Sequence, residues 1–333
     1  MSKRDCESPS DSNDYFKIEN YKITDLNSLI NMIIDLDNKS EPPRKIRKKL
    51  PVNIYKLLNI LEPLITLNNL IGMKKLKEQL LEQLLYFIQG NDDVIMLHTV
   101  IEGPPGTGKT TVANLMAVIY AGIGVLTKNK FRVIKRDDLI GKYLGETSIK
   151  TLKTLESCKN GVMLIDEAYS LGSGSSNSVD SYAKEAIDCI NQYLTENQDK
   201  FICIIAGYKD ELDSCFFSQN PGLRRRFPWT FTIDDFTNEE LVQVLIKMIK
   251  DCGWEIICTP EELTKMIKKQ HFTGNGGDIE NVISRAKIIH SKVNFGKDND
   301  YILTNEILSE AFNKFYETRK NNDISPPPFM MYS

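Results

Sequence analysis

The pattern of apolar and polar positions divides the chain into a middle part that alternates strand and helix signals and a last part that is helical. Five short apolar runs in the middle part read as strands: 100–101, 131–134, 161–165, 201–207 and 229–233. Helical spacing follows the first run, over 112–117. Runs this apolar predict a parallel sheet covered by helices on both faces, which is an α/β fold.

Three helices are expected before the first strand. Residues 21–36 carry apolar residues at helical spacing, and a second helix starts at Ile54, where Pro63 is expected to interrupt it. A third helix follows Gly72. The apolar stripes of the three are Leu26, Leu29, Ile30 and Ile33; Leu57, Leu58 and Leu61; and Met73, Leu76, Leu80, Leu84 and Phe87.

Beyond Asp235 the strand signals stop. Thr237 and Glu240 have the spacing of a helix N-cap, and an apolar stripe at helical spacing follows over 241–249. Further helices are expected over 261–269, 278–291 and 304–316, so the C-terminal domain should be small and all-helical. We expect a variable N-terminal segment over 1–50, an α/β domain over 51–235, a helical lid domain over 236–318 and a flexible tail over 319–333.

Composition narrows the class of protein. The 333 residues are 41% hydrophobic and 26% charged, which suits about two globular domains. The N-terminus is too polar for a secretory signal, and no apolar run is long enough to span a bilayer. The 7 scattered cysteines and 3 distant histidines argue against a disulfide framework and against a Cys/His metal site. We therefore expect a soluble intracellular protein, cytoplasmic or nuclear.

Charge gives little support for nucleic acid as a partner. The net charge of -3 produces no global basic field. Residues 1–20 are polar and acidic and are expected to be disordered. A basic, proline-containing cluster lies at 42–51, and it can be read as a solvated linker or as a nuclear-import or polyanion-binding signal.

A phosphate-binding loop lies between the first strand and the helix after it. The segment fits G-x-x-x-x-G-K-[ST], in which glycines let backbone N–H groups wrap phosphates and the helix N-terminus favours negative charge. Lys109 is expected to reach the β and γ phosphates of ATP, and Thr110 to bind Mg²⁺. The expected nucleotide-binding residues of this loop are Gly103, Pro104, Pro105, Gly106, Thr107, Gly108, Lys109, Thr110 and Thr111.

Two carboxylates end the third apolar run. Asp166 and Glu167 follow a buried strand downstream of the phosphate loop, the setting of a Walker B element. Because the ends of parallel strands meet at one sheet edge, both should lie near the phosphates. Asp166 is then expected to hold Mg²⁺, directly or through water, and Glu167 to polarise the water that attacks the γ-phosphate.

Three consecutive arginines, Arg224–Arg226, precede the last strand. They can form a solvated basic turn. They can instead supply a guanidinium to a γ-phosphate bound by a neighbouring subunit, because arginine offers a delocalised charge and a fixed fork of donors.

Taken in order, these motifs resemble the AAA+ ATPases. The chain is most similar to the group that contains stage V sporulation protein K and the red-type rubisco activase, over about residues 68–318. Residues 1–50 and the tail match nothing in the family. The resemblance rests on Leu70-Ile71-Gly72, the phosphate loop, Asp138–Gly145, Asp166–Leu171, Lys184–Asp188, Ala206-Gly207-Tyr208 and Asn220–Phe227.

The resemblance implies a ring of identical subunits, usually a hexamer, with ATP bound between them. Residues around Ile71 and Gly72 would contact the adenine, and Arg226 matches the arginine finger, a role that Arg224 could share. Tyr143-Leu144-Gly145 matches the pore loop that grips a threaded polypeptide client. An exposed aromatic ring contacts almost any chain without reading its sequence.

Two departures from the family bear on coupling. Tyr208 stands at a strand tip where many relatives carry asparagine or threonine, and the segment around Gly277 lacks the arginine that relatives often place near the γ-phosphate. The expected activity is ATP-driven remodelling of a protein client. The alternatives are an ATP-dependent assembly module with little threading and, with less support, a nucleic-acid motor.

Overall fold

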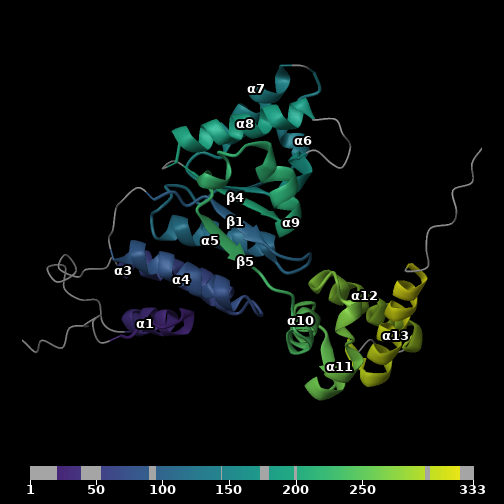
Figure 1. The fold of residues 1–333 in the computed structure, drawn as a ribbon. Helices are drawn as coiled ribbons and strands as arrows, with labels where there is room; N and C mark the ends of the chain where they lie inside the picture. The colour runs from purple at the N-terminus through teal and green to yellow at the C-terminus, as the bar shows by residue number, and fades with distance from the viewer. Residues whose placement is uncertain are drawn as a thin grey trace, which may run out of the picture.

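The computed structural model describes residues 21–38, 54–89, 95–143, 145–172, 180–198, 201–296 and 301–322. The expectations for residues 1–20, the basic cluster at 42–51, Leu144 and the tail beyond residue 322 lie outside these ranges. Figure 1 shows two bodies: a sheet with helices on both faces, and a smaller, mainly helical body that the C-terminal elements form.

The larger body is built on a five-stranded parallel sheet, which confirms the predicted fold class. The strand order is β2-β3-β4-β1-β5. Strands β1, β3 and β4 are buried at every position, as a sheet covered on both faces requires. The strands are β1 (Thr99–Glu102), β2 (Phe131–Ile134), β3 (Val162–Ile165), β4 (Ile202–Gly207) and β5 (Trp229–Thr232).

Alternate residues of the central strands enter two separate apolar clusters. Ile204 of β4 packs into the cluster that α1 (Leu26–Asn38), α3 (Ile54–Asn68), α4 (Lys74–Ile88) and α5 (Lys109–Gly122) share. Cys203 and Ile205 pack into the opposite cluster, with α7 (Glu146–Ser157) and α8 (Ser181–Glu196). In Figure 1 these helix groups lie on opposite faces of the sheet. The short helices α6 (Arg136–Leu139) and α9 (Lys209–Glu211) connect elements near the strand ends.

The expected break at Pro63 is absent, because α3 runs through this residue to Asn68. A proline inside a helix costs about 3 kcal/mol. Burying a large apolar side chain stabilises by about 1.5–3 kcal/mol, and four such side chains on this helix outweigh the break. The stripe is also rotated from the expected one, since Leu58 and Leu61 are only half-buried. The fully buried positions are Leu57, Ile60, Leu64 and Leu67.

The C-terminal body has its own apolar cluster and the expected helical character. Thr237 caps α10 as predicted: its hydroxyl accepts from Glu240 N (3.2 Å), and the Glu240 carboxylate accepts from Thr237 N (2.9 Å). A short parallel pair, β6 with β7, was not predicted, because runs of three residues give no clear strand period. The elements are α10 (Asn238–Asp251), β6 (Glu255–Ile257), α11 (Pro260–Met266), α12 (Gly276–Val293), β7 (Ile302–Thr304) and α13 (Asn305–Asn322).

Within the described ranges, no helix is both long enough and apolar enough to cross a membrane. The same ranges contain no group of three or more His, Cys, Asp or Glu side chains arranged to hold a metal ion. The six cysteines described there are free thiols, and Cys158 and Cys203 among them are buried.

Candidate functional site

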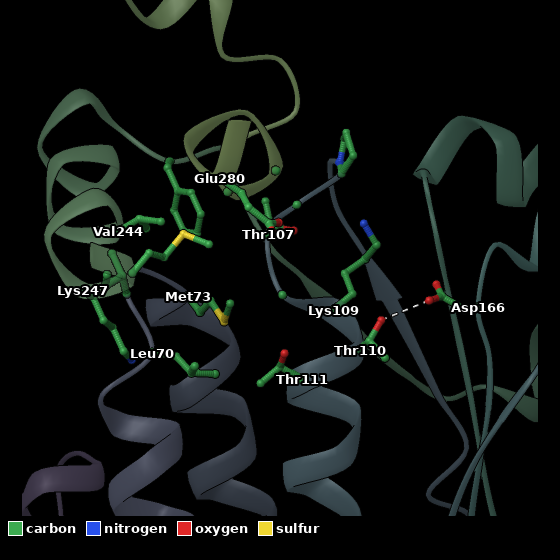
Figure 2. Close-up of a pocket in the computed structure, with 18 of the residues that line it drawn as sticks. Leu70, Met73, Thr107, Lys109, Thr110, Thr111, Asp166, Val244, Lys247 and Glu280 are labelled. Carbon is green, nitrogen blue, oxygen red and sulfur yellow. Dashed lines mark hydrogen bonds between the residues drawn. The ribbon is translucent and has the colours of Figure 1, made fainter. Parts of the chain in front are cut away.

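A cavity of about 610 Å³ opens where the carboxyl ends of the sheet meet the C-terminal body. Figure 2 shows its lining residues, with Lys109, Thr110 and Asp166 on the sheet side and Val244, Lys247 and Glu280 on the other. The remaining lining groups include residues 105–111 of the phosphate loop, Glu167, Tyr169, Tyr208, Phe236, Met248 and Gly276. The cavity therefore has a phosphate-loop wall and a lid wall.

The phosphate loop joins β1 to α5, as predicted, and it turns through left-handed backbone at Gly106 (φ 67°) and Gly108 (φ 88°). Lys109 begins α5 and folds over the loop, where its Nζ donates to Gly103 O (2.8 Å) and Pro104 O (2.7 Å). Burial lowers the pKa of Lys109, and the nearby carboxylates Asp166 and Glu167 oppose that shift. Among the described residues, Lys109 Nζ contacts these two loop carbonyls and the ring of Tyr208, so the ammonium group is available to a polyphosphate.

Thr110 and Asp166 meet beside the loop although 56 residues separate them. The Thr110 hydroxyl donates to Asp166 Oδ2 at 3.0 Å, and Glu167 N donates to Asp166 Oδ1 at 3.1 Å. Glu167 is exposed and has left-handed backbone (φ 51°), and it starts the 3-10 turn over residues 168–171. One hydroxyl and one carboxylate beside a phosphate loop form the oxygen donor set that Mg²⁺ takes together with phosphate oxygens.

A pair of tyrosines closes the cavity near Glu167. Tyr208 directly follows β4, and its ring stacks on Tyr169 with centroids 5.7 Å apart and planes 23° apart. Lys109 Nζ lies 5.4 Å from the centroid of the Tyr208 ring. The sequence placed Tyr208 at a strand tip, but it did not identify Tyr169, which lies in the 3-10 turn that follows Glu167.

The lid wall is joined to the phosphate loop through Asn275, whose side chain is fully buried. Its Nδ2 donates to Pro105 O (3.2 Å) and to Asp235 Oδ1 (2.9 Å), while its Oδ1 accepts from Phe236 N (3.3 Å). Its backbone adopts φ 47° and ψ -118°, a conformation costly for any residue with a side chain. The next amide, Gly276 N, donates to Gly106 O at 3.1 Å.

The end of the cavity away from Asp166 is mainly apolar, although Lys247 and Asp251 also line it. Ile71, expected to contact the base, does line it, whereas Gly72 does not and supplies a left-handed turn (φ 70°). Lys77 Nζ donates to Leu70 O (2.5 Å), and Lys247 Nζ donates to Asn69 O (3.0 Å), so two lysines hold this turn. The facing lid residues are Phe236, Val244 and Met248. The sequence did not identify them, because Val244 and Met248 belong to a stripe that reads as core and Phe236 precedes the helix cap.

The three arginines form a 3-10 turn and do not line the cavity of their own chain. Arg224 contacts Asp213 Oδ1 (3.1 Å) and the buried Glu102 (3.8 Å), and it lies 4.4 Å from the centre of the Phe217 ring. Burial raises the pKa of Glu102, and the charge of Arg224 opposes that rise. Arg226 differs, because its buried Nε has no hydrogen-bond partner among the described residues.

Tyr143 lies on a loop apart from the cavity and is 70% exposed. The Glu146 carboxylate accepts from Lys142 N and Tyr143 N, both at 3.2 Å, and so fixes the loop to the start of α7. Gly145 has left-handed backbone (φ 83°) with no atoms within 4 Å of where a Cβ would stand. Leu144, expected beside Tyr143, lies outside the described residues.

Comparisons with known proteins agree with this geometry. The family model "ATPase family associated with various cellular activities (AAA)" matches residues 99–230. A putative cfxQ-like protein of Acanthamoeba polyphaga mimivirus is 37% identical over 308 residues, which cover 88% of this chain and 75% of that protein. Stage V sporulation protein K of Bacillus subtilis is 35% identical over 201 residues, 57% of this chain and 60% of its own length.

Two solved structures share the fold. The RuvB Holliday junction branch migration motor of Thermotoga maritima matches with a TM-score of 0.51 and 19% identity, over 74% of this chain and 70% of that one. The FIGL-1 AAA domain in complex with ADP matches with a TM-score of 0.51 and 20% identity, over 76% and 89%. Identities this low establish the architecture alone.

Proposed function

The chain belongs to the AAA family of ATPases, in the group of the cfxQ-like proteins and stage V sporulation protein K, and we propose that it uses ATP hydrolysis to remodel a protein partner within a ring of identical subunits. The family and the nucleotide-binding fold make the chain an ATP hydrolase. The observation that carries the proposal is the convergence of Lys109, the Thr110–Asp166 pair and Glu167 on one cavity.

The roles of the phosphate-side residues follow from their positions. Lys109 would exchange its two carbonyl partners for β and γ phosphate oxygens, since a charged acceptor forms the stronger hydrogen bond. Thr110 and Asp166 would hold Mg²⁺, which supplies positive charge to the phosphate oxygens. Glu167 would accept the proton of the attacking water as general base. The loop amides and the start of α5 would bind the remaining phosphate charge.

Glu167→Gln tests the hydrolytic assignment. The variant should bind ATP with the parent's affinity and lose about 10²–10⁴-fold in kcat, the usual contribution of a general base. Glu196→Gln is the matched control, because Glu196 is exposed on α8, lies outside the cavity lining and accepts a hydrogen bond from Gln192 (2.8 Å). A Glu167→Gln variant that hydrolyses ATP at the parent rate would contradict the role of Glu167.

We divide the chain at residues 235/236 into an α/β nucleotide-binding unit over 51–235 and a lid over 236–318. The lid's buried apolar cluster draws its members from residues 236–316, and among the described residues before 236 only Ile71 packs against it. Such a unit can keep its own core while its contacts with the phosphate loop form or break.

A ring is supported by the position of the arginines outside their own chain's cavity. Because Arg224 is paired within the chain, Arg226 is the better candidate for a finger that reaches the next subunit's γ-phosphate. Arg226→Ala should bind ATP yet hydrolyse it slowly, whereas Lys109→Ala should fail to bind it.

Mixing these two inactive variants should restore part of the ATP turnover, since some interfaces then pair an intact Lys109 with an intact Arg226. Mixed assembly is verified first, by differently tagged subunits. Arg226→Ala that is fully active as a monomer would exclude a shared site. If verified mixed rings recover no ATP turnover, either the finger is Arg224 or Arg225, or all subunits of the ring must be intact for any of them to hydrolyse ATP.

A protein client is supported by Tyr143, an exposed aromatic ring on a loop that Glu146 fixes. The client is identified by trapping on the Glu167→Gln ring with ATP, and its unfolding is then followed with the parent protein. Tyr143→Ala should abolish that unfolding while ATP turnover falls much less, and Tyr143→Phe should retain it. Normal remodelling by Tyr143→Ala would favour the assembly module over threading.

A further inference from the structure

Glu167 needs a partner to act as a general base, because nothing in its own backbone directs the carboxylate. The residue is exposed and left-handed (φ 51°), and it precedes a 3-10 turn instead of lying within a helix. An exposed glutamate has several accessible rotamers, and holding one of them costs conformational entropy. A hydrogen-bond donor beside it would lower that cost.

Two residues later, Tyr169 is placed to be this donor. Tyr169 and Glu167 line the same cavity, and burial first, then the charge of Glu167, raises the pKa of Tyr169 to about 12. The hydroxyl is therefore protonated at neutral pH and can donate to the carboxylate. The half-buried Tyr169 ring lines the cavity and stacks on the ring of Tyr208, which lines the cavity as well.

The tip of β4 is built to receive that ring. The ring of Tyr208 stacks on Tyr169 at 5.7 Å, with Lys109 Nζ 5.4 Å from the Tyr208 centroid. Gly207 leaves the necessary room, because a Cβ at this position would stand 3.0 Å from Tyr169 Cδ1 and from the Leu212 side chain. At this strand tip, where many relatives carry asparagine or threonine, the chain therefore has an aromatic ring. A short polar side chain there could contact the attacking water directly, whereas the Tyr208 ring supports Tyr169.

We propose that Tyr169 and Tyr208 are positioning residues for ATP hydrolysis: the Tyr169 hydroxyl aims the Glu167 carboxylate, and the Tyr208 ring supports Tyr169 and the Lys109 ammonium. The inference rests on the proposed role of Glu167 as general base. The inference also explains why Tyr208 can replace a polar residue at the tip of β4. The polar group that orients the attacking water is then the Tyr169 hydroxyl, which follows β3 and acts through Glu167.

The primary test is Tyr169→Phe, which keeps the stacked ring and removes only the hydroxyl. Loss of one hydrogen bond to a charged group predicts a fall in kcat of about 10- to 100-fold, with the KM and Kd for ATP unchanged. Tyr182→Phe on α8 is the matched control, since Tyr182 does not line the cavity, and it should keep the parent kcat. A purely structural Tyr169 would instead change Kd and thermal stability together with kcat.

A double-mutant cycle separates positioning from independent effects. In the Glu167→Gln background, Tyr169→Phe should lower the residual turnover by less than about twofold, because the group that Tyr169 positions is already lost. Losses that multiply would overturn the proposal, as would Tyr169→Phe with the parent kcat. If Glu167→Gln itself keeps the parent rate, the hydrolytic assignment fails first, so the two failures are distinguishable.

Two further variants keep the proposal testable if Tyr169→Phe folds poorly. Gly207→Ala should displace the Tyr169 ring and lower kcat while leaving the hydroxyl in the chain. Tyr208→Leu should lower kcat more than Tyr208→Phe does, because only the leucine removes the stacking face. Equal kcat for Tyr208→Leu and the parent would show that the platform plays no part.

Discussion

The two walls of the nucleotide cavity are built on different principles. The phosphate wall lies at the ends of β1, β3 and β4, strands buried along their whole length in one parallel sheet. The lid wall has its own apolar cluster and meets the phosphate loop through a few hydrogen bonds around Asn275 and Gly276.

This difference suggests how the two walls share the work. Groups at the ends of buried strands cannot shift without disturbing the sheet, so the phosphate wall suits charge placement and chemistry. A body docked by a few hydrogen bonds belongs to the less stable end of a protein's local equilibria. We therefore expect changes in the phosphate wall to act on affinity and turnover, and changes at the lid contact to act on docking and stability.

The largest effect is expected at the phosphate wall. Lys109→Ala should weaken ATP binding by at least about 100-fold, because a crowded polyanion loses a desolvated counter-charge. Lys247→Ala is the comparison on the lid wall, where Lys247 lines the same cavity and bonds to Asn69 O. Its loss should weaken binding by less than about tenfold. Titration calorimetry measures the Kd for ATP of both variants. An equal loss of affinity in the two variants would contradict the difference between the walls.

The second effect concerns the contact between the walls. A Cβ at Gly106 would stand 2.1 Å from Gly274 O, and φ there is 67°. Gly106→Ala should therefore push the lid away and lower the free energy of unfolding by about 2 kcal/mol. Gly277→Ala is the matched control, because no atom lies within 4 Å of its Cβ position. Chemical denaturation should leave that control within about 0.5 kcal/mol of the parent.

The third effect isolates the hydrogen bonds from the backbone strain at Asn275. Asn275→Ala loses the bonds to Pro105, Asp235 and Phe236 and keeps a side chain at φ 47°, which should cost about 1–2 kcal/mol. Asn275→Gly loses the same bonds but accepts this backbone freely, so it should be the more stable of the two. Hydrogen exchange over the start of α12 should rise in both. Unchanged exchange would mean that other contacts dock the lid.

The last effect is a pH dependence within the sheet, which is absent at neutral pH and grows as the pH falls. His98 is fully buried, and its Nδ1 accepts from Cys203 N at 3.1 Å, a bond that requires the neutral ring. Burial lowers the pKa of His98 to about 4 from 6.5. Between those values the unfolded chain binds a proton that the folded chain does not. The free energy of unfolding is therefore unaffected by His98 above about pH 6.5. Below that pH it declines by up to about 1.4 kcal/mol per pH unit.

The measurement is the free energy of unfolding at about pH 7, 6 and 5, for the parent and for His98→Gln. The variant should show a smaller slope over this window, because it lacks the titrating ring. An identical slope would assign the acid sensitivity to other groups. Loss of the sheet before loss of the lid contacts at low pH would reverse the expected order of the two walls.

The phosphate wall could be predicted from the sequence because its information is local. Each strand is a short apolar run, and Lys109, Asp166 and Glu167 each stand at a fixed distance from the end of one. The parallel register then brings the strand ends together without further information. The C-terminal helices were likewise predicted, since caps and apolar stripes are properties of single segments.

What only the tertiary structure decided depends on which surfaces meet. Pro63 stays helical because α3 buries four apolar side chains against its neighbours, a gain that no local rule contains. Val244 and Met248 face the cavity although their spacing is that of ordinary core residues. Asn275 reaches the phosphate loop from 170 residues away, and Tyr169 meets Tyr208 across two strand ends. Local patterns specify elements and their termini, whereas contacts between elements follow from packing the whole chain.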